Sequence, residues 1–221
     1  MSVLPLTLLV VAKAPVPGRA KTRLAAKVGD RVAAQIAAAA LIDTLDAVEA
    51  TPVAARVVAL TGELHDAVDA AEIRDRLTTF TVIGQRGNDF ADRLANAHAD
   101  AAVDGHPVLQ IGMDTPQVTA ELLADCGRRL AQAPAVLGLA SDGGWWALGV
   151  RTAALAEHLR GVPMSHRNTG ALTLKALRSN GVSVSLLEEL ADVDVVDDVA
   201  AVRERCRPDS RFARATRQAG L

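Results

Sequence analysis

The first side chains in this sequence that could do chemistry are basic and lie close together near the amino terminus. No acidic residue interrupts them before Asp30. They follow an apolar run, residues 6–12, which predicts a buried parallel strand. Ligands of open α/β sheets bind at the carboxyl ends of strands, so we expect this loop to bind an anion such as phosphate. A solvated basic turn is the alternative. The basic residues are Lys13, Arg19, Lys21, Arg23 and Lys27.

Two prolines and a glycine stiffen the backbone of the same loop. Pro15, Pro17 and Gly18 favour an extended turn over an immediate helix, and the basic side chains are therefore presented from a fixed frame. The loop is not a Walker phosphate loop, because Ala20 precedes Lys21 where that motif requires glycine. The residues expected to bind phosphate are Ala12, Lys13, Arg19, Lys21 and Arg23.

A carboxylate follows a second apolar strand, residues 108–111. Asp114 lies two residues before Pro116, which prevents the chain from continuing as sheet. A carboxylate just past a strand end is well placed to hold a divalent cation, since Mg²⁺ favours one or two carboxylates together with substrate phosphates. Capping of the next turn or helix is the alternative role, although Thr119 is the better N-cap candidate.

Four more carboxylates lie within the seven residues from Asp192 to Asp198. In an extended segment Asp192 and Asp194 face the same side, and their like charges repel unless a cation neutralises them. We expect Asp194 to be the second metal ligand beside Asp114. Asp197 and Asp198 have a simpler explanation, because acids in the first turn of a helix interact favourably with its dipole.

A double glycine and two tryptophans form the next motif, residues 141–146. Gly143 and Gly144 allow the backbone to approach a ligand or to turn sharply. We expect them to help bind the nucleotide, with an ordinary turn as the alternative. One tryptophan is expected in the core, and the other could line a sugar or base pocket. Asp142 and His166 are the candidate catalytic residues, since His166 lies in a polar loop where it could meet substrate.

Composition limits the partners. The chain has 221 residues, 50% of them hydrophobic, and a net charge of −2, so positive charge is local and sized for a small anion. Aromatic residues make up only 2%, too few for a stacking platform for nucleic acid. The two cysteines, without metal-ligand spacing, are typical of a reducing compartment. Because no apolar run is long enough to span a membrane, we expect a cytoplasmic protein.

Strand-like and helix-like segments alternate along the chain, as in βαβ units. Gly181 is a candidate residue for ending the helix at 169–180. We expect a domain over residues 1–206 and a mobile or surface-lying basic tail over residues 207–221. The expected strands are residues 6–12, 55–60, 79–83, 107–111, 135–139, 145–150 and 182–187. The expected helices are residues 30–49, from 63, 89–103, 119–132, 152–160, 169–180 and 196–205.

Four of these segments, in this order, resemble those of the GT-A-fold nucleotide-diphospho-sugar transferase superfamily, and in particular its bacterial glycosyltransferase-like, radical-SAM/selenodomain-associated transferases. The segments are AKAPVPGRAKTRL, GMDTP, SDGGWWALGV and DVDVVDD. The resemblance implies a GT-A (Rossmann-like) three-layer α/β/α sandwich with a mostly parallel sheet. It also implies that the basic loop holds nucleotide phosphates and that Asp114 and Asp194 hold Mg²⁺ or Mn²⁺.

The implied activity is a metal-dependent transfer of the glycosyl group of a nucleoside diphosphate sugar to a small-molecule acceptor. A nucleotidyltransferase that uses a nucleoside triphosphate and releases pyrophosphate, like the related guanylyltransferases, would use the same residues. A non-catalytic nucleotide-binding module is a third reading, because the last motif has Asp194-Val-Val where the family usually has Asp-Thr-Pro. The base, the sugar, the acceptor and the oligomeric state stay open.

Overall fold

The sheet of this protein holds seven strands within residues 3–193 and 195–221, which are the residues that the computed structural model describes. Its strand order is β3-β2-β1-β4-β6-β5-β7, and β6 runs antiparallel to both of its neighbours. The predicted mostly parallel α/β sheet is confirmed. The strands are β1 (Leu4–Lys13), β2 (Val53–Thr61), β3 (Thr81–Gly84), β4 (Val108–Gly112), β5 (Ala135–Leu139), β6 (Trp145–Val150) and β7 (Val184–Leu186).

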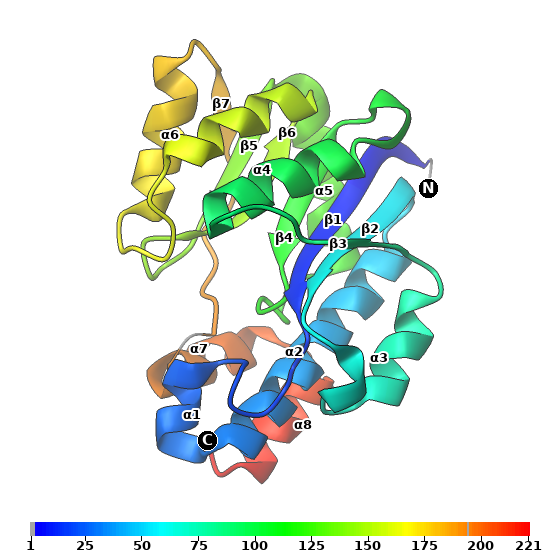
Figure 1. The fold of residues 1–221 in the computed structure, drawn as a ribbon, viewed down its shortest axis with the longest axis vertical. Helices are drawn as coiled ribbons and strands as arrows, with labels where there is room; N and C mark the ends of the chain where they lie inside the picture. The colour runs from blue at the N-terminus through cyan, green and yellow to red at the C-terminus, as the bar shows by residue number, and fades with distance from the viewer. Residues whose placement is uncertain (1–2, 194) are drawn as a thin grey trace.

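Helices cover both faces of the sheet (Figure 1), because successive residues of a strand point to opposite sides. In β1, Leu8 and Val10 pack in the same cluster as α2, α3 and α5, whereas Leu9 and Val11 pack with α4, η3 and α6. The helices are α1 (Thr22–Val28), α2 (Asp30–Ala50), α3 (Ala70–Leu77), α4 (Phe90–Ala101), α5 (Ala120–Gln132), α6 (Thr169–Ser179), α7 (Val196–Arg205) and α8 (Arg211–Gln218), with short 3₁₀ helices η1 (Leu64–Asp66), η2 (Val103–Gly105) and η3 (Ala153–Gly161).

A third apolar cluster lies outside these two layers and joins α1, α2, α7 and α8. Figure 1 shows these four helices together at one end of the molecule. Phe212 of α8 is fully buried in the cluster, and the backbone N–H groups of Arg211 and Phe212 donate to the Asp43 carboxylate of α2. Residues 207–221, expected to form a mobile or surface-lying tail, thus contain a helix that is anchored to α2 by one aromatic side chain and one carboxylate.

Three other segments differ from their expected structure. The basic loop passes directly into α1, which the prolines of the loop did not predict. The helix expected from residue 63 is split into η1 and α3, because Asp69 adopts a left-handed conformation, φ 52°, between them. The helix expected over residues 152–160 is the 3₁₀ helix η3. Gly181 ends α6 as predicted, with φ 76° and with the Val182 N–H donating to the Leu177 carbonyl.

Candidate functional site

The basic loop projects from the carboxyl end of β1, between the ends of β2 and β4. Gly18 has φ 74°, a left-handed conformation that favours glycine, and the Ala20 N–H donates to the Val16 carbonyl 3.1 Å away. The side chains of Lys13, Arg19 and Arg23 are exposed on this frame. The loop therefore holds its cations at the sheet edge where ligands of α/β proteins bind.

These cations surround a pocket of about 290 Å³ whose far wall is the loop after β4. The structure thus brings Asp114 next to the basic loop, from which it is separated by about 90 residues of sequence. Ala12, predicted to bind phosphate, is buried and does not line the pocket, and its carbonyl accepts a hydrogen bond of 2.8 Å from the Gln85 side chain. The pocket is lined by Lys13, Arg19, Ala20, Lys21, Thr22, Arg23, Ala37, Met113 and Asp114.

Lys21 and Asp114 form an ion pair at the base of this pocket. The Lys21 Nζ lies 2.5 Å from the Asp114 Oδ2 and also donates to the backbone carbonyl of Val193. The side chain of Lys21 is only 13% exposed, against 30% for Asp114. The Val193 N–H donates in turn to the Asp114 carbonyl, 3.3 Å away. One lysine therefore joins the basic loop, the end of β4 and the acidic segment before α7.

Among the described residues of that segment, Asp192 lies close enough to Lys21, Asp114 and Asp142 to feel their charges. Its carboxyl group is largely buried, and its Oδ1 has no hydrogen-bond partner among the described residues. Burial raises its pKa to about 7, with smaller contributions from the negative charges of Asp114 and Asp142, while Lys21 lowers it. Asp194, the predicted second metal ligand, lies outside the described residues. The sequence pattern predicted Asp194 as the second metal ligand, although it also placed Asp192 on the same side of an extended segment.

The donor chemistry of the site fits a hard divalent cation. Asp114, Asp192 and the Val193 carbonyl offer oxygen atoms, and the Asp192 Oδ1, for which the described residues provide no hydrogen-bond donor, is an acceptor that a cation would satisfy. Within residues 3–193 and 195–221, no three His, Cys, Asp or Glu side chains are grouped closely enough to hold a metal by themselves. Mg²⁺ is usually bound by one or two carboxylates plus substrate phosphates, which is the arrangement available here.

The turn between β5 and β6 carries Asp142 and the two glycines. The Asp142 Oδ1 accepts a hydrogen bond of 2.6 Å from the Gly144 N–H. Gly143 has φ 91°, and a Cβ at this position would lie 1.8 Å from the Arg167 carbonyl oxygen. The Gly170 N–H also donates to the Gly143 carbonyl. The close backbone approach that these glycines allow is thus made to the loop before α6.

The remaining predicted residues lie around this turn. His166 is exposed, and its Nδ1 accepts a hydrogen bond of 3.3 Å from the Asn168 N–H. No hydrogen bond or ion pair between described residues links His166 to the basic pocket. Trp146 is the core tryptophan, with its Nε1 donating to the Glu188 carbonyl, whereas Trp145 is partly exposed.

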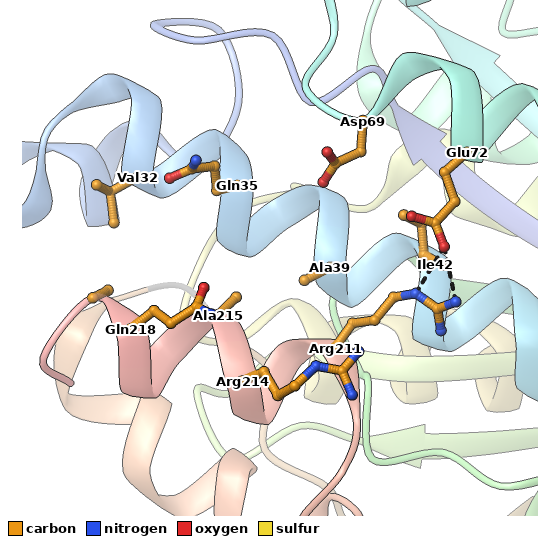
Figure 2. A pocket seen from close by; sticks show the side chains of 11 residues that line it. Val32, Gln35, Ala39, Ile42, Asp69, Glu72, Arg211, Arg214, Ala215 and Gln218 are labelled. Carbon is orange, nitrogen blue, oxygen red and sulfur yellow. Dashed lines mark hydrogen bonds and ion pairs between the residues drawn. The ribbon is translucent and has the colours of Figure 1, made fainter.

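A larger cavity, of about 500 Å³, lies elsewhere, between α2, α3 and α8. Figure 2 shows Arg211 of α8 bridging to Glu72 of α3 along one wall of this cavity. None of the residues predicted for the site lines it. The chemistry predicted from the sequence therefore belongs to the smaller, basic pocket.

The mostly parallel sheet flanked by helices has the GT-A, Rossmann-like fold, and the cation-lined pocket lies at the end of its strand β1. The chain belongs to DUF2064, a family described as uncharacterized proteins conserved in bacteria, whose profile matches residues 44–166. This match includes Asp114 and Asp142 but neither the basic loop nor Asp192. A search of curated proteins found no significant match.

Solved structures share the fold at low sequence identity. A Desulfovibrio desulfuricans G20 protein, provisionally named a nucleotide-diphospho-sugar transferase, is 24% identical with a TM-score of 0.86, over 100% of this chain and 96% of the other. Rv0371c of Mycobacterium tuberculosis H37Rv, in complex with manganese, is 20% identical with a TM-score of 0.55, over 89% and 97%. A CMP:2-keto-3-deoxy-manno-octonic acid synthetase in complex with CTP is 12% identical with a TM-score of 0.52, over 90% and 97%.

No helix in the described part of the chain has the length and apolar character needed to cross a membrane.

Proposed function

We propose that this protein is a metal-dependent transferase that binds a nucleoside diphosphate sugar in the basic pocket and transfers its glycosyl group to a small acceptor. The observation that carries the proposal is the convergence of four cationic side chains and Asp114 on one pocket of about 290 Å³. Cations of this kind bind phosphate through charge-assisted hydrogen bonds. The name of the Desulfovibrio protein that shares the fold supports the donor class.

Each group of the pocket has a distinct task in this proposal. Lys13, Arg19 and Arg23 bind the phosphate oxygens of the donor. Asp114 and Asp192, with Asp194 as predicted from the sequence, would hold Mg²⁺ or Mn²⁺. When bound, the ion would neutralise charge on the diphosphate and on the leaving group. The manganese complex of Rv0371c supports a divalent ion in a protein of this fold.

The acceptor side of the site is assigned to the turn between β5 and β6. In glycosyl transfer an acceptor oxygen attacks the anomeric carbon, the bond from this carbon to the diphosphate oxygen breaks, and a nucleoside diphosphate leaves. In this proposal Asp142 accepts the proton of the acceptor, and the effect of its negative charge on Asp192 supports a place near the site. His166, exposed in the neighbouring loop, is the alternative proton acceptor.

Nucleotidyl transfer is the second candidate reaction. The CTP complex of a synthetase with the same fold favours it. In this reaction an acceptor oxygen attacks the α-phosphorus of a nucleoside triphosphate, and pyrophosphate leaves, while the basic loop and the aspartates keep their tasks. Membership of the narrower radical-SAM/selenodomain-associated transferases remains a prediction from the sequence motifs.

Thermal unfolding with UDP, GDP, CTP and GTP, with and without Mn²⁺, tests the proposal, because a ligand of the native state raises the unfolding temperature. Stabilisation by diphosphates but not by triphosphates supports glycosyl transfer, and the reverse supports nucleotidyl transfer. Stabilisation without turnover of nucleotide sugars or triphosphates would indicate a binding module. If no nucleotide stabilises the protein, the proposal is wrong.

A pair of matched variants locates the binding site. Asp114→Asn is expected to abolish the Mn²⁺-dependent part of the thermal shift. Asp69→Asn removes a carboxylate from the larger cavity between α2, α3 and α8 and should leave the shift unchanged. A shift that survives Asp114→Asn would remove this residue from the metal site.

A further inference from the structure

Lys21 differs from the other cations of the basic pocket in what its side chain contacts. The side chains of Lys13 and Arg19 are exposed, whereas the Lys21 ammonium points inward to the Asp114 carboxylate and the Val193 carbonyl. The Lys21 backbone is left-handed, with φ 49° and ψ 48°, a conformation that residues other than glycine, asparagine and aspartate rarely adopt. Unusual backbone conformations of this kind cluster at functional sites.

The Lys21 ammonium occupies the position where a divalent cation would contact Asp114. It lies 2.5 Å from the Asp114 Oδ2 and also donates to the Val193 carbonyl, so it contacts two of the three oxygen donors proposed above for the metal. Mg²⁺ binds carboxylate oxygens at about 2.0–2.1 Å, so an ion on this oxygen would meet the ammonium at close range. Two cations so close together repel strongly in a partly buried site. Lys21 and the ion are therefore alternative partners of the same carboxylate.

Phosphate oxygens would offer Lys21 another position. Lys21 lines the same pocket as Lys13, Arg19 and Arg23, where we expect the diphosphate to bind. The lysine side chain is a flexible four-carbon stem with a compact charge, so its ammonium can move between two nearby anions without a change in the fold. A diphosphate entering the pocket would draw Lys21 away from Asp114 as it brings the ion in.

We propose that Lys21 is a built-in counter-ion of the Asp114 site that is exchanged for the divalent metal when a diphosphate enters the basic pocket. The binding of diphosphate in this exchange rests on the proposed function. The competition of Lys21 and a divalent cation for Asp114 rests only on the contacts of this chain. The exchange makes the site bind the metal weakly alone and tightly together with phosphate. Linkage requires the reciprocal effect, so the metal raises the affinity for diphosphate by the same factor.

The test is a titration of the full-length protein with Mn²⁺ alone, followed by electron paramagnetic resonance of the free ion. Lys21→Met removes the charge and keeps the length of the side chain, and we expect it to bind Mn²⁺ about tenfold more tightly than the wild type, because a repelling cation is gone. Lys21→Gly removes the same charge and suits the left-handed backbone, so it provides a second variant should methionine disturb folding. Lys13→Met is the matched control, since Lys13 lines the same pocket without contacting Asp114.

Lys13→Met should change Mn²⁺ affinity by less than about threefold, because an exposed charge is screened by solvent and salt. Equal or weaker Mn²⁺ binding by both Lys21 variants, including no binding at all, would overturn the exchange. A second titration with inorganic pyrophosphate, by calorimetry with and without Mn²⁺, should show metal enhancement of binding that is about tenfold smaller in Lys21→Met than in the wild type. If pyrophosphate does not bind the wild type, the proposed function fails while the Mn²⁺ result still decides the exchange.

Discussion

Asp192 and His98 are two of the buried ionisable side chains among the described residues, and their surroundings differ. Asp192 lies beside Lys21, Asp114 and Asp142, and burial near these charges is typical of a functional site. His98 is fully buried on the inner side of α4, where Gln110 of β4 is its polar neighbour. Among the described residues, no charged group contributes to the pKa shift of His98, so we assign its effect to stability.

Burial lowers the pKa of His98 from 6.5 to about 4. Because His98 is harder to protonate in the folded state than in the unfolded state, the unfolded state binds more protons at acid pH. The contribution of His98 to the free energy of unfolding is therefore complete above pH 6.5 and is lost as the pH falls from 6.5 toward 4. Between pH 7.5 and pH 5.0 we expect this single group to remove about 2 kcal/mol of unfolding free energy. Urea unfolding at the two pH values measures the loss.

Variants at two histidines isolate this effect. His98→Leu should reduce the loss of stability between pH 7.5 and pH 5.0 by about 2 kcal/mol, whatever its cost at pH 7.5. His65, whose side chain is 67% exposed, is the control, and His65→Leu should leave the loss unchanged. An unchanged loss in His98→Leu would show that other groups cause the acid sensitivity.

At the scale of residues, the sequence could predict the part of the site that is local in the chain. Lys13, Arg19, Lys21 and Arg23 follow one strand within eleven residues, so the strand pattern alone places them together. The contact of Lys21 with Asp114 joins residues 93 positions apart, and only the pairing of β1 with β4 brings them together. No local pattern in the sequence indicates that Asp192 is buried near Lys21 and Asp114.

At the scale of elements, the turn between β5 and β6 is held in place by its contact with the loop before α6. Gly143→Ala is expected to cost about 3 kcal/mol or more of unfolding free energy, because its Cβ would overlap the Arg167 carbonyl in addition to the strain of a positive φ. Gly181→Ala is the matched control, with φ 76° and no atom within 4 Å of its Cβ, and should cost about 1 kcal/mol. Denaturant unfolding of the two variants compares them; equal costs would contradict the packing of the turn.

Gln117 connects the loop after β4 to the acidic segment. Its side chain is buried, and its Nε2 donates to the Ala191 carbonyl, one residue before Asp192. Gln117→Leu should weaken Mn²⁺ binding severalfold and cost about 1–3 kcal/mol of stability, since it leaves the Ala191 carbonyl without its donor. Mn²⁺ titration and urea unfolding measure the two effects.

Thr115 provides the control on the same loop. Its buried hydroxyl has no partner among the described residues, so Thr115→Val should leave both stability and Mn²⁺ affinity nearly unchanged. Equal Mn²⁺ affinities of Gln117→Leu and the wild type would show that Gln117 does not position the acidic segment.

The elements that the sequence predicted well are those with a strong apolar pattern. The seven strands within the described residues were expected close to their observed positions, because most of them contain short apolar runs. The elements that were missed are α1 and α8, of seven and eight residues, which carry several basic side chains and only short apolar faces. Their stability comes from packing against α2 and α7, which is a property of the fold rather than of the local sequence.

At the scale of the whole molecule, the apolar cluster of α1, α2, α7 and α8 packs next to the basic loop, which lines the pocket, and next to the acidic segment, whose Val193 carbonyl contacts Lys21. α1 follows the basic loop directly, and α7 follows the acidic segment. Leu24 of α1, Val199 of α7 and Phe212 of α8 meet in this cluster. The carboxyl-terminal helix, remote from the pocket in sequence, should therefore influence the geometry of the site.

Phe212→Ala tests this connection. Because Phe212 is fully buried, we expect its truncation to cost about 3–5 kcal/mol of unfolding free energy. Under conditions where the variant remains folded, looser packing of α1 and α7 should also weaken binding of pyrophosphate with Mn²⁺. Arg214→Ala is the control on the exposed side of α8 and should change stability by less than about 0.5 kcal/mol. Wild-type binding by folded Phe212→Ala would mean that the pocket is positioned by the sheet alone, without the helical cluster at its side.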